Sequence, residues 1–124
     1  MTKDQVMKGM GAYIAQKTKG KEFEWREHKR IEGATIVAES KTEHYEIREY
    51  WHNPEMLIKR NEGTNNSELI LIYFADSEWC GEHIVYTGNF RVREMNVIGN
   101  DVRKMAAEAK LIIDFIEKKG AESE

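Results

Sequence analysis

A row of polar residues in segment 43–51 has the chemistry to bind an anion. Side chains of an extended strand alternate between two faces, so every second residue of this segment shares one face. Segment 90–94 carries a similar outward pair of arginines, and guanidinium groups suit carboxylate and phosphate. A solvated sheet face with cross-strand ion pairs between Arg and Glu explains the same pattern. The predicted binding residues are His44, Arg48, Tyr50, Arg91 and Arg93.

Two glutamates, Glu49 and Glu94, stand in phase with apolar residues of their segments. A carboxyl group among apolar side chains holds its proton more tightly and can serve as a general acid or base, and two such groups can cooperate. Both positions lie near predicted strand ends, where a side chain can also reach water or an ion-pair partner. We therefore treat Glu49 and Glu94 as weak catalytic candidates, with a rim or buried ion pair as the alternative.

A metal site and a nucleophilic site are both poorly supported. Cys80 and His83 form a single short-spaced pair, whereas zinc sites need three or four protein ligands. A turn at residues 79–81 with a packed tryptophan explains the same residues. A thiolate pair lacks an orienting third group, and phosphate-loop and dinucleotide-binding motifs are absent from the sequence. We predict no metal and no cofactor, and lean toward a protein that is not an enzyme.

The segment 17–30 mixes lysines and arginines with Phe23 and Trp25, a combination that can contact a nucleic-acid backbone and stack on bases. Residues 1–30 carry a net charge of +4 and the rest of the chain −7, for a total of −3. Three glutamates within the segment offset half of its positive charge. A charged edge strand that discourages aggregation is the alternative interpretation.

The elements that must position these residues follow from periodicity. A capping box begins at Thr2, and apolar residues at helical spacing predict a helix over 3–18 that ends near Gly20. Gly9 and Gly11 each weaken this helix by about 1 kcal/mol relative to alanine, so it depends on packing. Close approach to the sheet is one reason for glycine there.

The central part of the chain alternates with a period of two between short turn signals, which predicts an antiparallel meander. The run 69–75 is apolar on both faces, so we expect a central strand covered on each side, by two helices or by a sheet that curls back. The predicted strands are 22–30, 33–39, 43–51, 55–61, 68–75, 82–87 and 89–97.

The C-terminal segment predicts an amphipathic helix that Asn100 caps and residues 118–120 end. Its apolar stripe must bury against the sheet or a partner. The fold class is therefore α+β, with an N-terminal helix, a curved antiparallel sheet of six to seven strands and a C-terminal helix packed on the sheet. We expect one domain over 1–120 and a frayed tail over 121–124. The stripe comprises Val102, Met105, Ala106, Ala109, Ile112, Ile113 and Ile116.

The longest apolar run is far shorter than the roughly 20 residues of a membrane-spanning helix. A single cysteine and the absence of a signal-like N-terminus lead us to expect a cytosolic protein that does not enter membranes.

Three functions are compatible with the sequence. The first is a non-catalytic regulator, adaptor or inhibitor that binds another protein through the polar sheet face or the N-terminal helix. The second is a small-ligand domain or enzyme whose sheet and C-terminal helix form a cup lined by Glu49, Glu94, Tyr45 and Trp51. The third is nucleic-acid binding through 17–30. We also predict a homodimer, because one face of the apolar strand would otherwise remain uncovered.

Overall fold

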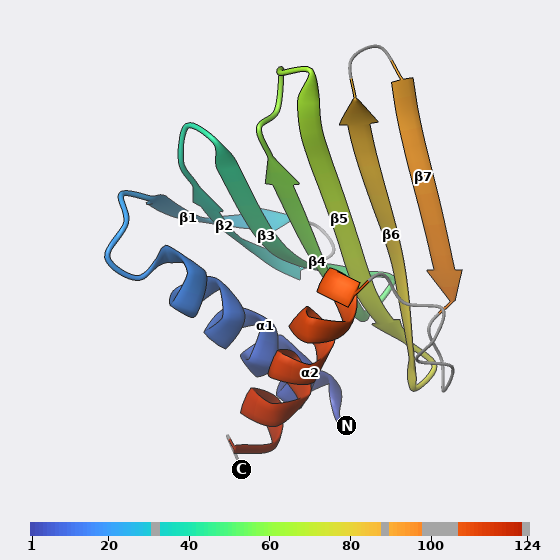
Figure 1. Cartoon of the computed structure of the whole chain (residues 1–124). Coiled ribbons are helices and arrows are strands. Elements are labelled where there is room, and N and C mark those ends of the chain that lie inside the picture. Colours follow the sequence, from blue (N-terminus) through green and yellow to red (C-terminus); the bar gives the residue numbers. More distant parts are fainter. Residues whose placement is uncertain (31–32, 88–89, 98–106, 123–124) are drawn as a thin grey trace.

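The computed structural model has two helices and seven strands in the order of the sequence (Figure 1). It describes the backbone of residues 1–30, 33–87, 90–97 and 107–122, and the side chains of 1–27, 36–49, 51–86 and 108–122. The elements are α1 Lys3–Thr18, β1 Glu24–Arg30, β2 Gly33–Glu39, β3 Glu43–Tyr50, β4 Asn53–Arg60, β5 Asn66–Ala75, β6 Glu78–Thr87, β7 Phe90–Val97 and α2 Ala107–Glu122.

The seven strands form one antiparallel sheet in the order β1 to β7, which confirms the predicted meander. Residues with positive φ make several of the hairpin turns: Trp51 and His52 join β3 to β4, and Asp76 and Ser77 join β5 to β6. Positive φ at two consecutive central residues suits the right-handed twist of the strands. The predicted turn at 79–81 is wrong, because the chain reverses at 76–77 and β6 begins at Glu78, four residues before the predicted start.

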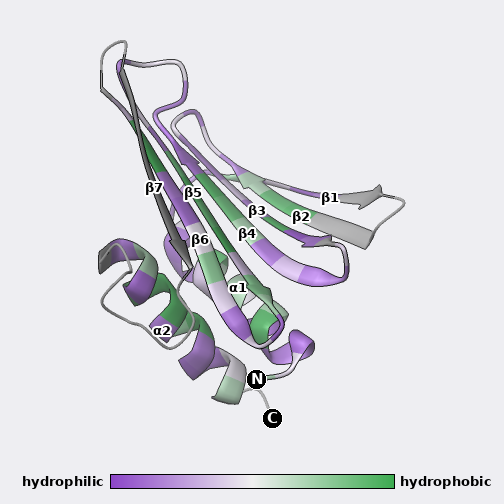
Figure 2. Ribbon diagram, turned by 90° about the vertical axis from the view of Figure 1, so that its right-hand side faces the viewer, coloured by the Kyte–Doolittle hydropathy of each residue, from purple (hydrophilic) through white to green (hydrophobic). Residues whose placement is uncertain are grey.

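Both helices lie on the same side of the sheet, as Figures 1 and 2 show. We call this the inner face, and the opposite one the outer face. Alternate side chains of β2 to β6 pack with the apolar sides of α1 and α2 into one core. The expectation of a helix on each side of β5 is therefore wrong, and neither helix covers the outer face. The inner-face core residues of the sheet include Ala38, Tyr45, Ile47, Met56, Ile58, Ile70, Ile72 and Trp79.

Helix α1 has the predicted bounds and capping box. The Thr2 side chain accepts a hydrogen bond from the Gln5 amide at 3.2 Å, and the Gln5 side chain accepts one from the Thr2 amide at 2.8 Å. Gly9 is buried against α2, not against the sheet: a Cβ atom there would lie 2.2 Å from the Ile116 carbonyl oxygen. Gly11 has no atom within 4 Å of such a position, so only Gly9 serves close packing.

Helix α2 runs through Gly120, where the sequence predicts its end, to Glu122. Gly120 allows a second close approach to α1, because a Cβ atom there would lie 2.4 Å from the Gln5 carbonyl oxygen. The described part of the predicted stripe is buried, from Ala109 through Ile112, Ile113 and Ile116. Asn100, Val102, Met105 and Ala106 lie outside the described residues. Within the described part of the chain, neither helix has the length and apolarity to cross a membrane.

Candidate functional site

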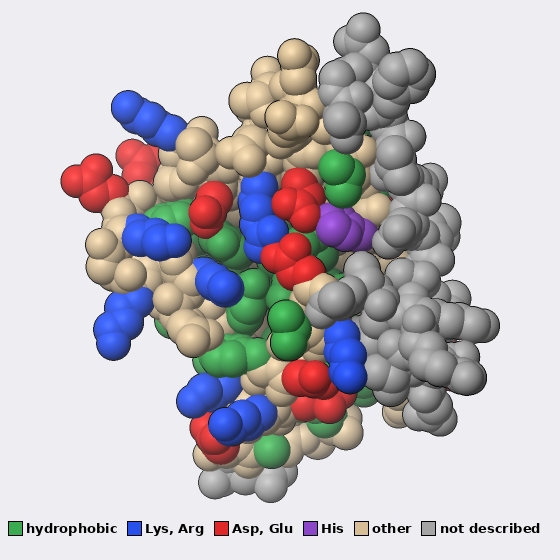
Figure 3. Space-filling view, viewed as in Figure 1, with side chains coloured by type: hydrophobic (Ala, Val, Ile, Leu, Met, Phe, Trp, Pro, Cys, Tyr) green, Lys and Arg blue, Asp and Glu red, His purple; other side chains and the backbone are tan. Residues whose placement is uncertain are grey.

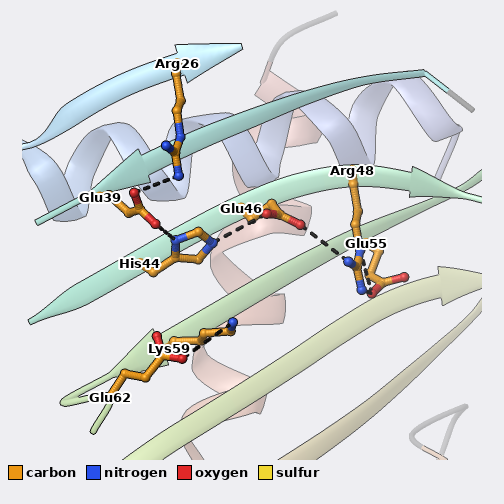
Figure 4. Close-up of polar contacts among 8 residues, drawn as sticks. All are labelled: Arg26, Glu39, His44, Glu46, Arg48, Glu55, Lys59 and Glu62. Carbon is orange, nitrogen blue, oxygen red and sulfur yellow. Dashed lines mark hydrogen bonds and ion pairs between the residues drawn. The ribbon is translucent and has the colours of Figure 1, made fainter. Parts of the chain in front are cut away.

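The outer face carries a continuous row of paired charges across β1 to β4, which Figure 4 shows with the helices behind the sheet. We call it the charge ladder. Cross-strand register explains it, since residues opposite each other on neighbouring strands share a face. Its members are Arg26, Glu39, His44, Glu46, Arg48 and Glu55.

The ladder begins at the edge strand. Arg26 Nη2 lies 2.7 Å from Glu39 Oε2, and the other oxygen of Glu39 lies 2.6 Å from His44 Nδ1. His44 Nε2 lies 3.4 Å from Glu46 Oε1. Both ring nitrogens of His44 therefore face carboxylate oxygens. The hydrogen bond with His44 lowers the pKa of Glu39 below its ordinary value.

The other end of the ladder is more buried. Arg48 donates from Nε and Nη2 to Glu55 Oε1 at 3.0 and 2.5 Å, and from Nη1 to Glu46 Oε2 at 3.4 Å. Glu46 and Glu55 are only 7% and 5% exposed although neither helix covers them. Neighbouring side chains of the sheet have thus already removed most water from these two carboxylates, and Arg48 supplies the charge that makes this tolerable.

Apolar side chains lie beside the ladder on the same face. Leu57 of β4 pairs with Glu46 on one side and with Leu71 on the other, and Tyr73 pairs with Glu55. Ile84 of β6 pairs with Leu69 and is 2% exposed, while the others are partly buried. Burial and the neighbouring Cys80 raise the pKa of Tyr73. We call this set the apolar strip; it comprises Leu57, Leu69, Leu71, Tyr73 and Ile84.

The structure places only part of the predicted anion site. His44 and Arg48 lie four residues apart on the outer face of β3, and carboxylates already occupy their donors. Arg91 and Arg93 pair in backbone register with Tyr86 and Ile84, but their side chains and that of Tyr50 lie outside the described residues. Anion binding by the five residues stays a prediction.

The catalytic candidates do not meet in a described site. Glu49 lies at the rim of the inner face, where Lys3 Nζ contacts Glu49 Oε2 at 2.9 Å, so an ion pair of the kind weighed as the alternative is present. The side chain of Glu94 lies outside the described residues. Tyr45 is buried in the core with its ring 6.5 Å from that of Tyr13, and Trp51 is 70% exposed at a turn. Tyr45 thus packs in the core and Trp51 faces solvent, and a cup lined by all four residues stays a prediction.

A second polar cluster lies at the inner face near the start of α2, and sequence reasoning missed it. Arg60 Nη1 contacts Glu68 at 3.3 Å and Glu108 at 2.6 Å, and His83 Nε2 lies 2.5 Å from Glu68. Figure 3 shows acidic and basic side chains with a histidine gathered on this side of the molecule. We call it the rim cluster: Arg60, Glu68, His83 and Glu108.

The rim cluster fastens α2 to the sheet. Burial alone disfavours the charged Arg60 side chain, but the contacts with Glu108 and Glu68 outweigh it and raise the pKa of Arg60. Burial also raises the pKa of Tyr13, beside this cluster, to about 12, and burial together with the hydrogen bond to Glu43 raises that of Tyr45. The only sequence signal for the cluster is opposite charge at paired strand positions, such as Arg60 and Glu68.

Residues 21–24 of the segment 17–30 line one side of an open groove of about 590 Å³, and residues 39–41 at the β2–β3 turn line the other. Lys21 and Lys41 line it, together with three glutamates that offset their charge. Trp25 is 52% exposed on β1, and Phe23 packs on Tyr45. The basic and aromatic side chains of this segment therefore do not form one continuous positive surface among the described residues.

Metal and thiol chemistry find little support in the geometry. Cys80 pairs with Tyr73 on the outer face and His83 with Ile70 on the inner face, so the two side chains diverge across the sheet. No cluster of three potential metal ligands occurs among the residues that the structure describes.

Comparison with protein-family models, with curated proteins and with solved structures finds no match to this chain.

Proposed function

We propose that this chain is a non-catalytic interaction protein, a small regulator, adaptor or inhibitor, that binds another protein through the outer face of its sheet. The observation that carries the proposal is the apolar strip beside the charge ladder, partly buried on a face of the sheet that neither helix covers. Isolated apolar residues are ordinary on a protein surface, whereas a contiguous apolar patch bordered by polar groups is typical of a binding surface.

The composition of the face supports a protein partner. Interfaces combine a central apolar area with polar groups that fix register, and the charge ladder offers such groups in a fixed arrangement. Arg48 is already held by two carboxylates, so little side-chain entropy is lost when a partner packs against it. A cytosolic location fits the single cysteine of the chain.

The test compares two substitutions of the same kind. Leu71→Lys places a charge at the centre of the apolar strip, where its cross-strand neighbour Glu82 offers an opposite charge that favours folding. Leu111→Lys changes an exposed α2 residue, 69% exposed, and is the matched control.

Tagged wild-type protein and the two variants are purified from the native host, and the co-purifying proteins are identified by mass spectrometry. We expect wild type and Leu111→Lys to retain the same bound protein, whether a foreign chain or an untagged second copy, and Leu71→Lys to lose it. Equal retention by Leu71→Lys would contradict binding through the outer face.

A further inference from the structure

We infer that the protein bound at the outer face is a second copy of this chain, with two outer faces stacked around a two-fold axis. This inference rests on the proposed function and names its partner. The resulting dimer has four layers, in the order helices, sheet, sheet, helices. Stacked sheets pack about 10 Å apart with their side chains interdigitated, so each apolar strip would be covered by the other.

The size of the face matches a stable dimer. Strands lie about 4.8 Å apart and rise about 3.4 Å per residue, so seven strands of seven to ten residues make a face of roughly 900 Å². A standard interface buries about 800 Å² on each partner. Because both helices lie on the inner face, the outer face of the sheet has about the area that one partner buries in a standard interface.

The charges of the face suit a copy of itself. A two-fold interface needs a surface that is complementary to itself. The charge ladder places two guanidinium groups among three carboxylates, with His44 between Glu39 and Glu46. Two such ladders can place opposite charges against one another, whereas a strongly acidic or basic partner would meet like charges as well as opposite ones.

Burial of the Glu46 and Glu55 end of the ladder requires little new desolvation. The main obstacle to burying ion pairs is the removal of water from each charge. Glu46 and Glu55 are already 7% and 5% exposed and are held by Arg48, so most of that water is absent before association. Carboxylates that have already lost most of their water, on a face that neither helix covers, are what we expect of a surface that binds a second copy of the chain.

The first experiment measures mass by light scattering from low-micromolar to near-millimolar protein. We expect the wild-type mass to rise from 14.5 kDa toward twice that value. Leu71→Lys should raise the dissociation constant about tenfold or more, since burying one leucine side chain is worth that factor or above. Leu111→Lys should leave it unchanged. Circular dichroism and thermal melts check that both variants fold.

The second experiment uses the unaltered protein, so it does not depend on a variant that folds. Cys80, the single cysteine, lies on the outer face beside Tyr73. Its rate of reaction with a thiol reagent should fall as protein concentration rises through the dimerisation range. A monomer at all concentrations with a constant Cys80 rate would overturn the dimer, and so would an oligomer that Leu111→Lys breaks and Leu71→Lys does not.

The two proposals fail separately. A strictly monomeric protein that still captures a foreign protein from its host, and loses it on Leu71→Lys, would refute the second copy and leave the binding face in place. A monomer whose capture is unaffected by Leu71→Lys would refute both.

Discussion

Replacing Gly9 with alanine should force α1 and α2 apart. The added Cβ would lie 2.2 Å from the Ile116 carbonyl oxygen and 2.7 Å from Ile116 Cγ2, whereas non-bonded carbon atoms rest at about 3.5–4.0 Å. The nearest atom belongs to the backbone of a helix, which cannot rotate away as a side chain can. The helices must therefore separate by about 1 Å along a contact that holds much of the core.

The expected magnitude combines two opposing effects. Alanine favours a helix over glycine by about 1 kcal/mol, and forced overpacking costs about 1–3 kcal/mol. For Gly9→Ala we therefore expect a net loss of stability of up to about 2 kcal/mol. For Gly11→Ala only the helix propensity acts, since no atom lies within 4 Å of the new Cβ. We expect that variant to gain about 0.5–1 kcal/mol.

Urea unfolding followed by circular dichroism measures both variants at one fixed protein concentration, because association shifts apparent stability. The midpoint should fall for Gly9→Ala and rise for Gly11→Ala, with the slope unchanged. A stability gain at both positions would refute the close contact between α1 and α2 on which the helix layer depends.

Three further predictions concern charge and pH. Arg48→Ala leaves Glu55 buried without its cation and should lower stability by about 2 kcal/mol, allowing for the partial exposure of the arginine. Adding Glu55→Gln to this variant should recover part of the lost stability. Additive losses in a double-mutant cycle would contradict the pairing of the two residues. Burial raises the pKa of Tyr13 from 10.0 to about 12, so the stability that its neutral phenol contributes is complete below pH 10 and is lost as pH rises through 12. Thermal melts of Tyr13→Phe should show a shallower alkaline decline than wild type, and an equally steep one would count against the buried phenol. The hydrogen bond with His44 lowers the pKa of Glu39, so its contribution is present above the ordinary value of 4.5 and lost as pH falls below it. Glu39→Gln should therefore be less stable than wild type at neutral pH and equal to it in strong acid; a deficit that persists in acid would show that this linkage is not its cause.

Local sequence patterns predict most of the fold. The capping box at Thr2, the helical spacing after it and the alternation within the strands predict α1 and the meander nearly residue by residue. The start of β6 escapes such reasoning, because Asp76 and Ser77 turn the chain with positive φ without glycine, while Gly81 lies inside a strand. The placement of both helices on one face depends on tertiary packing, which residues 69–75, apolar on both sides, do not reveal.

The polar clusters, too, are predicted in part by the sequence and in part only by the structure. Alternation within β3 places His44 and Arg48 on one face, and cross-strand ion pairing was already the alternative interpretation of that face. Alternation does not identify the partner of each charged residue, which depends on the register between strands. Arg48 meets Glu55 because the turn at 51–52 aligns β3 with β4. The rim cluster cannot be predicted from strand register alone, because Glu108 comes from α2 and nothing in its local sequence predicts contact with Arg60. Gly9 likewise predicts a close approach, but its partner is α2 and not the sheet that we expect from the sequence.

The most direct test of the binding face is hydroxyl-radical footprinting of the chain in the assembly that it forms in its host, compared with the same chain after dissociation. Tyr73 and Cys80 should become reactive on dissociation, whereas Leu111, 69% exposed on α2, should react equally in both states. Equal reactivity of Tyr73 and Cys80 in the two states, with protection appearing elsewhere, would contradict the outer face as the binding surface.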